Sequence, residues 1–569
     1  MLLLSAILII VIGIVCLACG YIFYGGWLAK VWGVDPQRKT PAITVDDNVD
    51  YVAAKPEVLT GHHFSSIAGA GPISGPIQAA VFGWVPVFLW VVIGGIFFGG
   101  VHDFGALLAS VRHGGQSIGT VIEKNIGMRA KRLFLVFSYL VLLLVVAAFT
   151  SIVAKTFGAT YTDGVLDKAA SFYSESAAMI SVLFIAVAMG FGYFVYRKNA
   201  SVLVSTLIGV AVLVGVIIFG LKVQLYLPAD TWMWVLGIYI FIASVAPVWI
   251  LLQPRDYLSS FLLYAMILAS VVGIFGAHPV IEMPAFTGWT DPISSLGSMF
   301  PALFITVACG AISGFHSLVA SGTTAKQLSN EKYAKPIGYG SMLIECLLAL
   351  IALIAVGSIW SQFADRSVTV PTTVLATGVS TMLGSIFGDG IYTVTFALII
   401  LAVSAFCLTS LDTATRLARY MFTELFLKDG EASWKEAKGI RKILANPYIA
   451  TLITVVIGVW LGKSGYAKIW PLFGAANQLL AGLALLAVAA WLGNIGKKNK
   501  MFFIPMAFMI IVTLTSLIMT VIAKLNAIAA GGADIAVWLQ LVFGALLVIL
   551  AIFLVIEGVQ TLVKQKKAA

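Results

Sequence analysis

Long apolar stretches alternate with short polar connections along the whole chain. A helix needs about 20 apolar residues to cross a bilayer, and only a helix satisfies its own backbone there. By this criterion the sequence predicts fifteen membrane-spanning segments, at approximately 2–28, 62–82, 84–111, 132–156, 173–196, 200–222, 231–252, 257–276, 298–320, 338–361, 389–415, 446–462, 468–492, 501–524 and 534–559. The pattern therefore predicts an all-α polytopic membrane protein.

Composition agrees with a chain embedded in lipid. Of the 569 residues, 60% are hydrophobic and 11% are charged, whereas a soluble domain has about 25% charged residues. The sequence contains no P-loop, HExxH or GxSxG motif, and its five cysteines lie inside apolar segments, which argues against an ATPase, a hydrolase or a zinc site. We expect no enzyme activity and no cofactor or metal, apart from Na⁺ or H⁺ as a coupling ion.

The net charge of +10 resides in the loops between apolar segments, so we expect no nucleic-acid partner. On one side of the predicted topology, the loops and the C-terminal tail carry 28 of the 35 Lys and Arg residues, and the other side carries 7. Basic residues concentrate in cytoplasmic loops. The bias predicts a multi-pass protein of the cytoplasmic (inner) cell membrane, with its N-terminus outside and its C-terminus in the cytoplasm.

Three predicted segments contain helix-breaking residues. The second reads Ile67-Ala-Gly-Ala-Gly-Pro-Ile-Ser-Gly-Pro76, the seventh has Pro247 in mid-span, and the ninth contains the milder Cys309–Ser317 stretch. Proline removes a backbone donor and glycine weakens a helix, so we expect the second segment to be broken at Gly69–Pro76. Paired interruptions in two halves of a chain indicate a transport site, and a close-packing kink is the alternative interpretation.

The predicted topology contains two inverted sets of five helices. Segments two to six and seven to eleven each open with a proline-interrupted helix, which is the five-plus-five arrangement of leucine-transporter-type folds. We expect an N-terminal helix and cytoplasmic loop at 1–61, repeats at 62–222 and 231–420, a charged cytoplasmic linker at 421–445, and a four-helix extension at 446–569.

A broken helix exposes N–H groups that favour anions and carbonyl groups that suit cations. The predicted substrate-binding residues are Gly69, Ala70, Gly71, Pro72, Ser74, Gly75 and Pro247. The predicted cation-binding residues are Ala68, Gly71, Ser313 and Ser317. The two serines lie one helical turn apart and can serve one ion, although serine hydroxyls can instead bond to their own backbone.

Ionisable residues inside membrane segments are costly and point to function. The predicted gating and proton-coupling set is His62, His63, Asp103, Arg255, Asp256, His316, Glu345, Asp412 and Arg416, all in the cytoplasmic third of the topology. We expect the two arginines to pair with the carboxylates as a gate. A static ion-pair network is the alternative, with the paired histidines as simple interfacial residues. Asn477 and Gln478 are predicted to form hydrogen bonds between helices.

Several blocks together resemble the carbon starvation (CstA) family: Asp50-Tyr-Val with Gly61–Pro76, His102-Asp-Phe104, Pro247–Leu258, Ser313–Ser317 with Ser321–Thr324, and Leu411–Tyr420. The resemblance implies a bacterial or archaeal secondary transporter that takes up peptides or pyruvate when preferred carbon is scarce. It also implies the fold of the amino acid–polyamine–cation superfamily. The chain departs from long family members in its shorter C-terminal region and in Ala325, where proline often stands.

Together these features predict a secondary active importer of a small carbon nutrient, short peptides or pyruvate, coupled to protons or sodium. Its expected partners are that small molecule and the lipid bilayer. A passive channel or a membrane-embedded nutrient sensor is the alternative. The substrate, the coupling ion and the oligomeric state stay open at this point.

Overall fold

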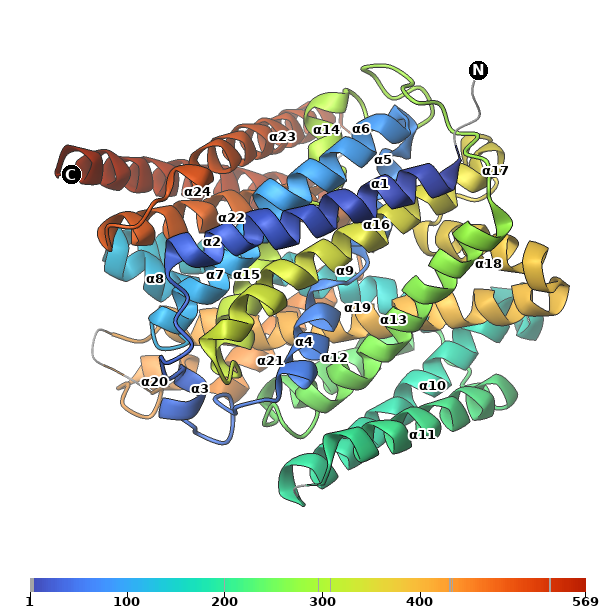
Figure 1. Cartoon of the computed structure of the whole chain (residues 1–569), viewed down its shortest axis with the longest axis horizontal. Coiled ribbons are helices and arrows are strands. Elements are labelled where there is room, and N and C mark those ends of the chain that lie inside the picture. Colours follow the sequence, from blue (N-terminus) through green and yellow to red (C-terminus); the bar gives the residue numbers. More distant parts are fainter. Residues whose placement is uncertain are drawn as a thin grey trace.

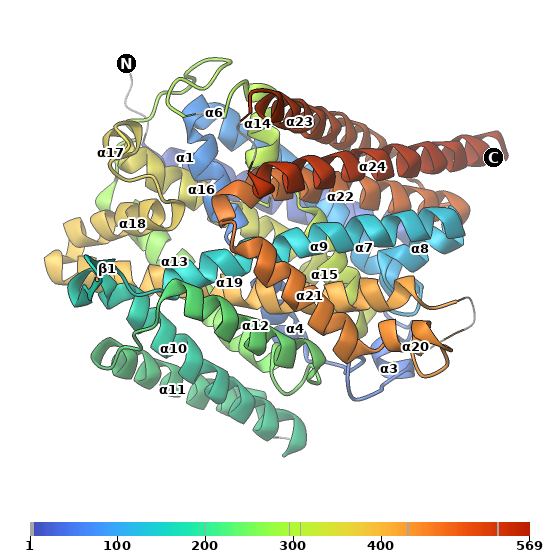
Figure 2. The same cartoon turned by 180° about the vertical axis from the view of Figure 1, so that it is seen from behind.

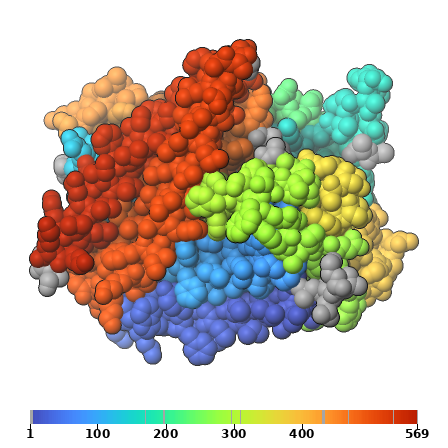
Figure 3. Space-filling view, turned by 90° about the horizontal axis from the view of Figure 1, so that it is seen from above, coloured from blue at the N-terminus to red at the C-terminus, as the bar shows by residue number. Residues whose placement is uncertain are grey.

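The structure is a computed structural model that describes residues 5–198, 200–294, 296–307, 309–428, 431, 433–531 and 534–568. Most long helices cross the molecule in roughly the same direction, and the two chain ends lie at opposite ends of its long axis (Figure 1). The short hairpin β1 (Tyr161–Thr162) and β2 (Val165–Leu166) is the one sheet in the described part of the chain. The C-terminal helices form one flank of the surface (Figure 3).

The helices of the first half are α1 (Ala6–Cys19), α2 (Gly25–Trp32), α3 (Pro41–Thr44), α4 (Pro56–Ile67), α5 (Gly71–Ala79), α6 (Trp84–Leu89), α7 (Gly100–Arg112), α8 (Ile118–Asn125), α9 (Met128–Phe157), α10 (Lys168–Gly192), α11 (Val202–Lys222), α12 (Ala229–Val245) and α13 (Leu252–Ala277). Those of the second half are α14 (Met299–Thr306), α15 (Gly314–Gly322), α16 (Ser341–Ser358), α17 (Trp360–Ala364), α18 (Pro371–Phe387), α19 (Asp389–Leu425), α20 (Ile440–Leu444), α21 (Pro447–Gly462), α22 (Tyr466–Asn494), α23 (Phe503–Ala529) and α24 (Ile535–Ala568). Wider π-helical turns at 20–24 and 90–99 join α1 to α2 and α6 to α7.

Eleven helical stretches of the described residues are long and apolar enough to cross a membrane, and α12 and α21 are shorter apolar helices. Each of these thirteen overlaps a predicted segment. The two remaining predicted segments are each a pair of short helices, α4 with α5 and α14 with α15. The chain is therefore an all-α, multi-pass membrane protein, and fifteen crossings stays a prediction.

The first broken helix is interrupted over a shorter stretch than predicted. α4 ends at Ile67 and α5 begins at Gly71, so the break comprises Ala68–Ala70 rather than Gly69–Pro76. Pro72 lies in the first turn of α5, where its missing N–H would have no helical partner anyway. The two prolines thus lie inside a second short helix, and the glycine-containing tripeptide forms the break.

Pro247 was predicted to lie in the middle of a spanning helix, and this prediction was wrong. α12 ends at Val245, and Pro247 lies in the connection that leads to α13. Ala246 has an extended backbone at φ −66° and ψ 148°, as expected for a residue that precedes proline. Because Val248 N–H donates to the Val49 carbonyl at 3.0 Å, this connection is tied to the loop before α4.

The longest helix that the sequence did not predict is α18. α18 packs against α13, α16 and α19, and it lies in the connection between α16 and α19. Its sequence, PTTVLATGVSTMLGSIF, mixes threonine, serine and glycine with apolar residues. It therefore falls short of the hydrophobic run that identifies a spanning helix from sequence.

The predicted linker 421–445 is only partly helical. α19 continues to Leu425, and the five-residue α20 follows at Ile440–Leu444. Residues 429, 430 and 432 of this linker lie outside the described residues.

Four continuous helices, α9, α12, α19 and α21, pack against one another as one group. α4 packs against α13, and α15 packs against α22. The α10–α11 pair lies at one edge of the molecule in both views (Figures 1 and 2). The broken helices thus stand next to this group, because α4 and α15 both pack against α19.

Candidate functional site

The two broken helices meet closely at glycines. A Cβ atom on Gly71 would lie 2.5 Å from the Cys309 side chain, and one on Gly75 would lie 2.6 Å from the Thr306 carbonyl oxygen. Thr306 ends α14 and Cys309 lies in the second break. The predicted residues from Ala68 to Gly75 are all buried. Small residues at these positions allow the two breaks to touch, as close helix packing in membranes requires.

Hydroxyl groups of α19 line the first break. The Ser410 hydroxyl donates to the Ser66 carbonyl at 3.1 Å, and the Thr413 and Ser66 hydroxyl oxygens lie 3.3 Å apart. A Cβ atom on Gly69 would lie 2.8 Å from Ser410 Oγ. Sequence reasoning missed these three hydroxyl residues. The signal available was the polar cluster Thr409-Ser410 with Thr413 inside an otherwise apolar span.

Ser313 and Ser317 have different hydrogen-bond partners. The Ser317 hydroxyl donates to the Gly314 carbonyl at 2.7 Å, which is the local backbone bond raised as the alternative. Ser313 precedes α15, and its hydroxyl oxygen accepts a hydrogen bond of 3.0 Å from the Asn477 amide. A shared ion site for Ser313 and Ser317 stays a prediction that these contacts do not favour.

Asn477 forms the hydrogen bonds between helices that were predicted for it. Its Oδ1 accepts from the Phe315 N–H at 2.7 Å, which satisfies an unpaired donor in the first turn of α15. The matching prediction for Gln478 was wrong. Its amide is buried and has no hydrogen-bond partner among the residues that the structure describes.

Three groups of ionisable residues lie outside the two breaks. The first, called here the Arg255 cluster, comprises His62, Tyr239, Arg255, Asp256 and Asp412. Arg255 lies 2.6 Å from Asp256 Oδ1 and also pairs with Asp412. Tyr239 donates to Asp412 at 2.6 Å, and His62 Nδ1 lies 2.8 Å from Asp256 Oδ2. These contacts join α4, α12, α13 and α19 and agree with the predicted pairing of Arg255.

The Arg255 cluster is connected directly to the break. The Ser66 hydroxyl, one residue from the end of α4, lies 3.2 Å from Asp256 Oδ2, and the Ser65 hydroxyl donates to the Asp256 carbonyl. A change of position at the end of α4 would therefore disturb the Arg255–Asp256 pair.

The second group, called the histidine–carboxylate chain, comprises His102, Asp103, His316 and Glu345. Asp103 lies 2.6 Å from His102 Nδ1 and 2.9 Å from His316 Nδ1, and His316 Nε2 lies 3.4 Å from Glu345. The expectation that arginines would pair with Asp103 or Glu345 was wrong. The arginine side chains come from α13 and α19, whereas these carboxylates lie on α7 and α16.

The third group, called the Asp50 latch, comprises Asp50, Arg416 and Arg419. Arg416 lies 2.9 Å from Asp50 and donates to the Ala243 and Ala246 carbonyls, and Arg419 lies 3.6 Å from Asp50. Burial by itself would raise the pKa of Asp50, but the cations Arg419, Lys326 and Arg416 together hold it below its ordinary value. Arg416 was expected to pair with a carboxylate inside a membrane segment. Its partner lies instead in the loop before α4.

The paired histidines His62 and His63 are buried between helices. Both side chains have no exposed surface. His62 contacts Asp256, and His63 Nδ1 lies 2.8 Å from the Thr324 hydroxyl. This burial and these two contacts do not favour the interpretation of His62 and His63 as simple interfacial residues. They connect α4 to α13 and to the 3-10 turn Thr324–Lys326 that follows α15.

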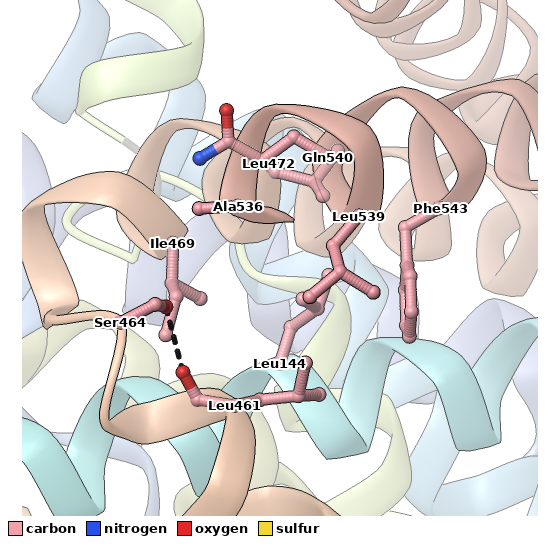
Figure 4. A pocket seen from close by; sticks show the side chains of 9 residues that line it. All are labelled: Leu144, Leu461, Ser464, Ile469, Leu472, Ala536, Leu539, Gln540 and Phe543. Carbon is pink, nitrogen blue, oxygen red and sulfur yellow. Dashed lines mark hydrogen bonds between the residues drawn. The ribbon is translucent and has the colours of Figure 1, made fainter. Parts of the chain in front are cut away.

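A small cavity elsewhere does not belong to this site. It measures about 30 Å³ and is lined by Leu144, Leu461, Ser464, Ile469, Leu472, Ala536, Leu539, Gln540 and Phe543 (Figure 4). That volume holds about one water molecule. The lining side chains come from α9, α22, α24 and the end of α21, and they include none of the predicted site residues.

Paired broken helices beside a group of continuous helices are the arrangement of leucine-transporter-type folds. A solved structure of a mutant of the manganese transporter of Eremococcus coleocola superposes with a TM-score of 0.52 over 92% of this chain and 99% of that chain. The two sequences are 11% identical, so the likeness concerns the fold alone. It agrees with the leucine-transporter-type fold that the sequence predicted.

The chain belongs to the carbon starvation protein CstA family, whose model matches residues 5–366 and 363–516. The peptide transporter CstA of Campylobacter jejuni is 34% identical, over 90% of this chain and 79% of that protein. The peptide transporter CstA of Escherichia coli is 33% identical, over 90% and 80%. The pyruvate/proton symporter BtsT of Escherichia coli is 31% identical, over 85% and 76%. The family match confirms the resemblance that the sequence showed, and these relatives are named as transporters.

Proposed function

We propose that the protein is a secondary active importer of a small carbon nutrient, a short peptide or pyruvate, across the cytoplasmic membrane. The observation that carries this proposal is the contact between two broken helices at Gly71–Cys309 and Gly75–Thr306. Half-helix ends at such a contact offer unpaired N–H and carbonyl groups to a ligand inside the membrane. The names of the relatives support the two substrate classes.

The packing supports a different division into repeats from the predicted one at 62–222 and 231–420. α4–α5, α6–α7, α9, α12 and α13 would form the first set, and α14–α15, α16, α19, α21 and α22 the second. α4 packs on α13 as α15 packs on α22, and α8 packs on α9 and α22 as α18 packs on α19 and α13. In this division each set opens with a broken helix, and the α10–α11 pair is an insertion.

The Arg255 cluster and the Asp50 latch fit an inner gate. Their contacts connect the end of α4 and the loop before it to α12, α13 and α19. A buried pair that loses one partner costs several kcal/mol, so the pairs must open together if the gate is to open at all. With the basic loops in the cytoplasm, this gate faces inward and the C-terminus is cytoplasmic.

Accumulation in proteoliposomes tests the proposal. The purified protein is reconstituted, and labelled pyruvate or alanyl-alanine is supplied outside under an imposed proton or sodium gradient. Accumulation above the external concentration that depends on one gradient is the expected result. Flux that stops at equal concentrations would identify a passive channel, and binding without flux a sensor. No gradient-dependent accumulation of either compound would contradict the proposal.

A further inference from the structure

The histidine–carboxylate chain takes no part in the ionic contacts of the proposed gate. Its four side chains, His102, Asp103, His316 and Glu345, have no exposed surface. They come from α7, α15 and α16. Within the described ranges, the ion pairs of Asp103 and Glu345 are with histidines alone. Two carboxylates are therefore buried without a lysine or arginine partner, which is costly if both are ionised.

The hydrogen-bond geometry of this chain requires a proton at one particular contact. An ionised carboxylate only accepts, so both histidines donate to Asp103 from Nδ1, over 2.6 and 2.9 Å. A neutral His316 ring then carries a lone pair on Nε2, and that atom lies 3.4 Å from Glu345 Oε2. Two unprotonated acceptors would repel each other there. Either Glu345 is protonated or His316 carries both protons.

Several hydrogen-bonding atoms of these four residues are unused, so one more proton can be bound here. Both oxygens of Glu345 and Nε2 of His102 have no hydrogen-bond partner among the described residues. Titratable groups that interact electrostatically with these four residues include His63 of α4, Cys309 before α15 and Cys346 of α16, and His62 acts in turn on His63. None of these groups is a permanent cation. A proton at the Glu345–His316 contact would neutralise the second carboxylate.

We propose that the Glu345–His316 contact binds the proton whose downhill movement drives uptake, with Asp103 and His102 orienting the His316 ring. This inference rests on the proposed transport function and names its coupling ion. The proton binds at Glu345 Oε2 or His316 Nε2 and leaves from the same atoms, and no other bond changes. Asp103 and His102 are positioning residues in this scheme.

The position of His316 explains how a proton can be linked to movement. His316 lies in the first turn of α15, directly after the second break, whereas its two carboxylate partners lie on α7 and α16. A rotation of α15 about residues 309–313 would separate His316 from both partners. Separation would leave Glu345 without its His316 neighbour. The protonation state of the Glu345–His316 contact therefore biases the position of α15.

A metal ion suits this chain of residues less well than a proton. Hard cations such as Mg²⁺ and Ca²⁺ take about six or more oxygen ligands, but here ring nitrogens stand between the two carboxylates. No group of three or more His, Cys, Asp or Glu that is able to hold a metal occurs in the described part of the chain. The hydroxyls of Ser66, Ser410 and Thr413 are a separate, oxygen-only environment.

Infrared difference spectroscopy tests the inference without any substrate. Wild type and Glu345→Gln are titrated in lipid, and the C=O stretching band of a protonated carboxylic acid is followed against pH. The expected result is a component of the band that titrates in wild type and in Glu175→Gln but is lost in Glu345→Gln. Glu175→Gln is the matched control, because Glu175 is also buried but lies on α10. A titrating band that persists unchanged in Glu345→Gln would overturn the inference.

Transport assays separate this inference from the proposed function. In Glu345→Gln and His316→Gln, accumulation driven by a pH gradient should fall to simple equilibration, while exchange of internal for external substrate at equal pH continues. Glu175→Gln should accumulate like wild type. If wild type accumulates substrate on a sodium gradient alone, the proton site is wrong and the importer stands. If no tested compound moves but the infrared band behaves as expected, the importer is wrong and the proton site stands.

Discussion

Asp50 and Arg416 are 366 positions apart in the chain, yet the Asp50 carboxylate and the Arg416 guanidinium lie 2.9 Å apart. Arg416 also donates to two carbonyls at the end of α12. One side chain of α19 thereby joins the loop before the first broken helix to the connection that precedes α13. The position of that loop therefore depends on where α19 holds the Arg416 side chain.

Replacing Asp50 should weaken this connection. We expect Asp50→Asn to destabilise the closed arrangement by about 2 kcal/mol, because a hydrogen bond to a charged group is lost. Hydrogen–deuterium exchange should then rise in residues 46–55. Asp46→Asn is the control, since Asp46 lies in the same loop and is exposed. Equal protection of residues 46–55 in Asp50→Asn and wild type would show that Asp50 does not hold the loop.

The Asp50 contact should be insensitive to pH near neutrality. Its carboxyl pKa is held below the ordinary value, so the stabilisation is complete above the unfolded pKa of about 4 and is lost only as the pH falls through the folded value. The difference in thermal midpoint between wild type and Asp50→Asn should therefore stay constant between about pH 5 and 8. A difference that shrinks steadily across that range would contradict the assignment.

Glycine at position 75 should be indispensable. A Cβ atom there would lie 2.6 Å from the Thr306 backbone oxygen, and overpacking of this kind costs about 1–3 kcal/mol. Gly75→Ala should lower the thermal midpoint and abolish uptake. Gly215→Ala on α11 has open space around the added atom and should leave both unchanged. Normal uptake by Gly75→Ala would mean that the two breaks need not touch.

Asn477 should stabilise the start of α15. Asn477→Ala removes the acceptor for the Phe315 N–H and should cost about 1 kcal/mol. Thermal unfolding in detergent measures this, and Gln478→Leu provides the neighbouring comparison because Gln478 has no partner within the described residues. A larger loss in Gln478→Leu than in Asn477→Ala would reverse the roles given to the two amides.

Neutralising either of two buried carboxylates should abolish accumulation of substrate without lowering expression. Asp103→Asn and Asp412→Asn are expected to reach the membrane in normal amount but to lose accumulation, since one positions His316 and the other pairs with Arg255. Immunoblots of membranes and uptake in proteoliposomes measure the two properties. Normal uptake by both variants would remove the coupling and gating roles from these residues.

The sequence by itself determined the features that depend on local chemistry. Runs of apolar residues specify helices in lipid wherever they occur. Glycine and proline disrupt a helix through their own backbone geometry, so breaks near residue 69 and before Ser313 were predictable. Even there, the extent of the first break depended on Pro72 being placed in the first turn of α5.

Only the tertiary structure decided which residues meet. The pairing of Arg416 with Asp50, and of Asp103 and Glu345 with His316, depends on contacts between helices far apart in sequence. α18 escaped prediction because packing on α13, α16 and α19 covers a helix that is not strongly apolar. A buried charge takes the partner that the packing brings within reach, and sequence spacing does not encode that distance.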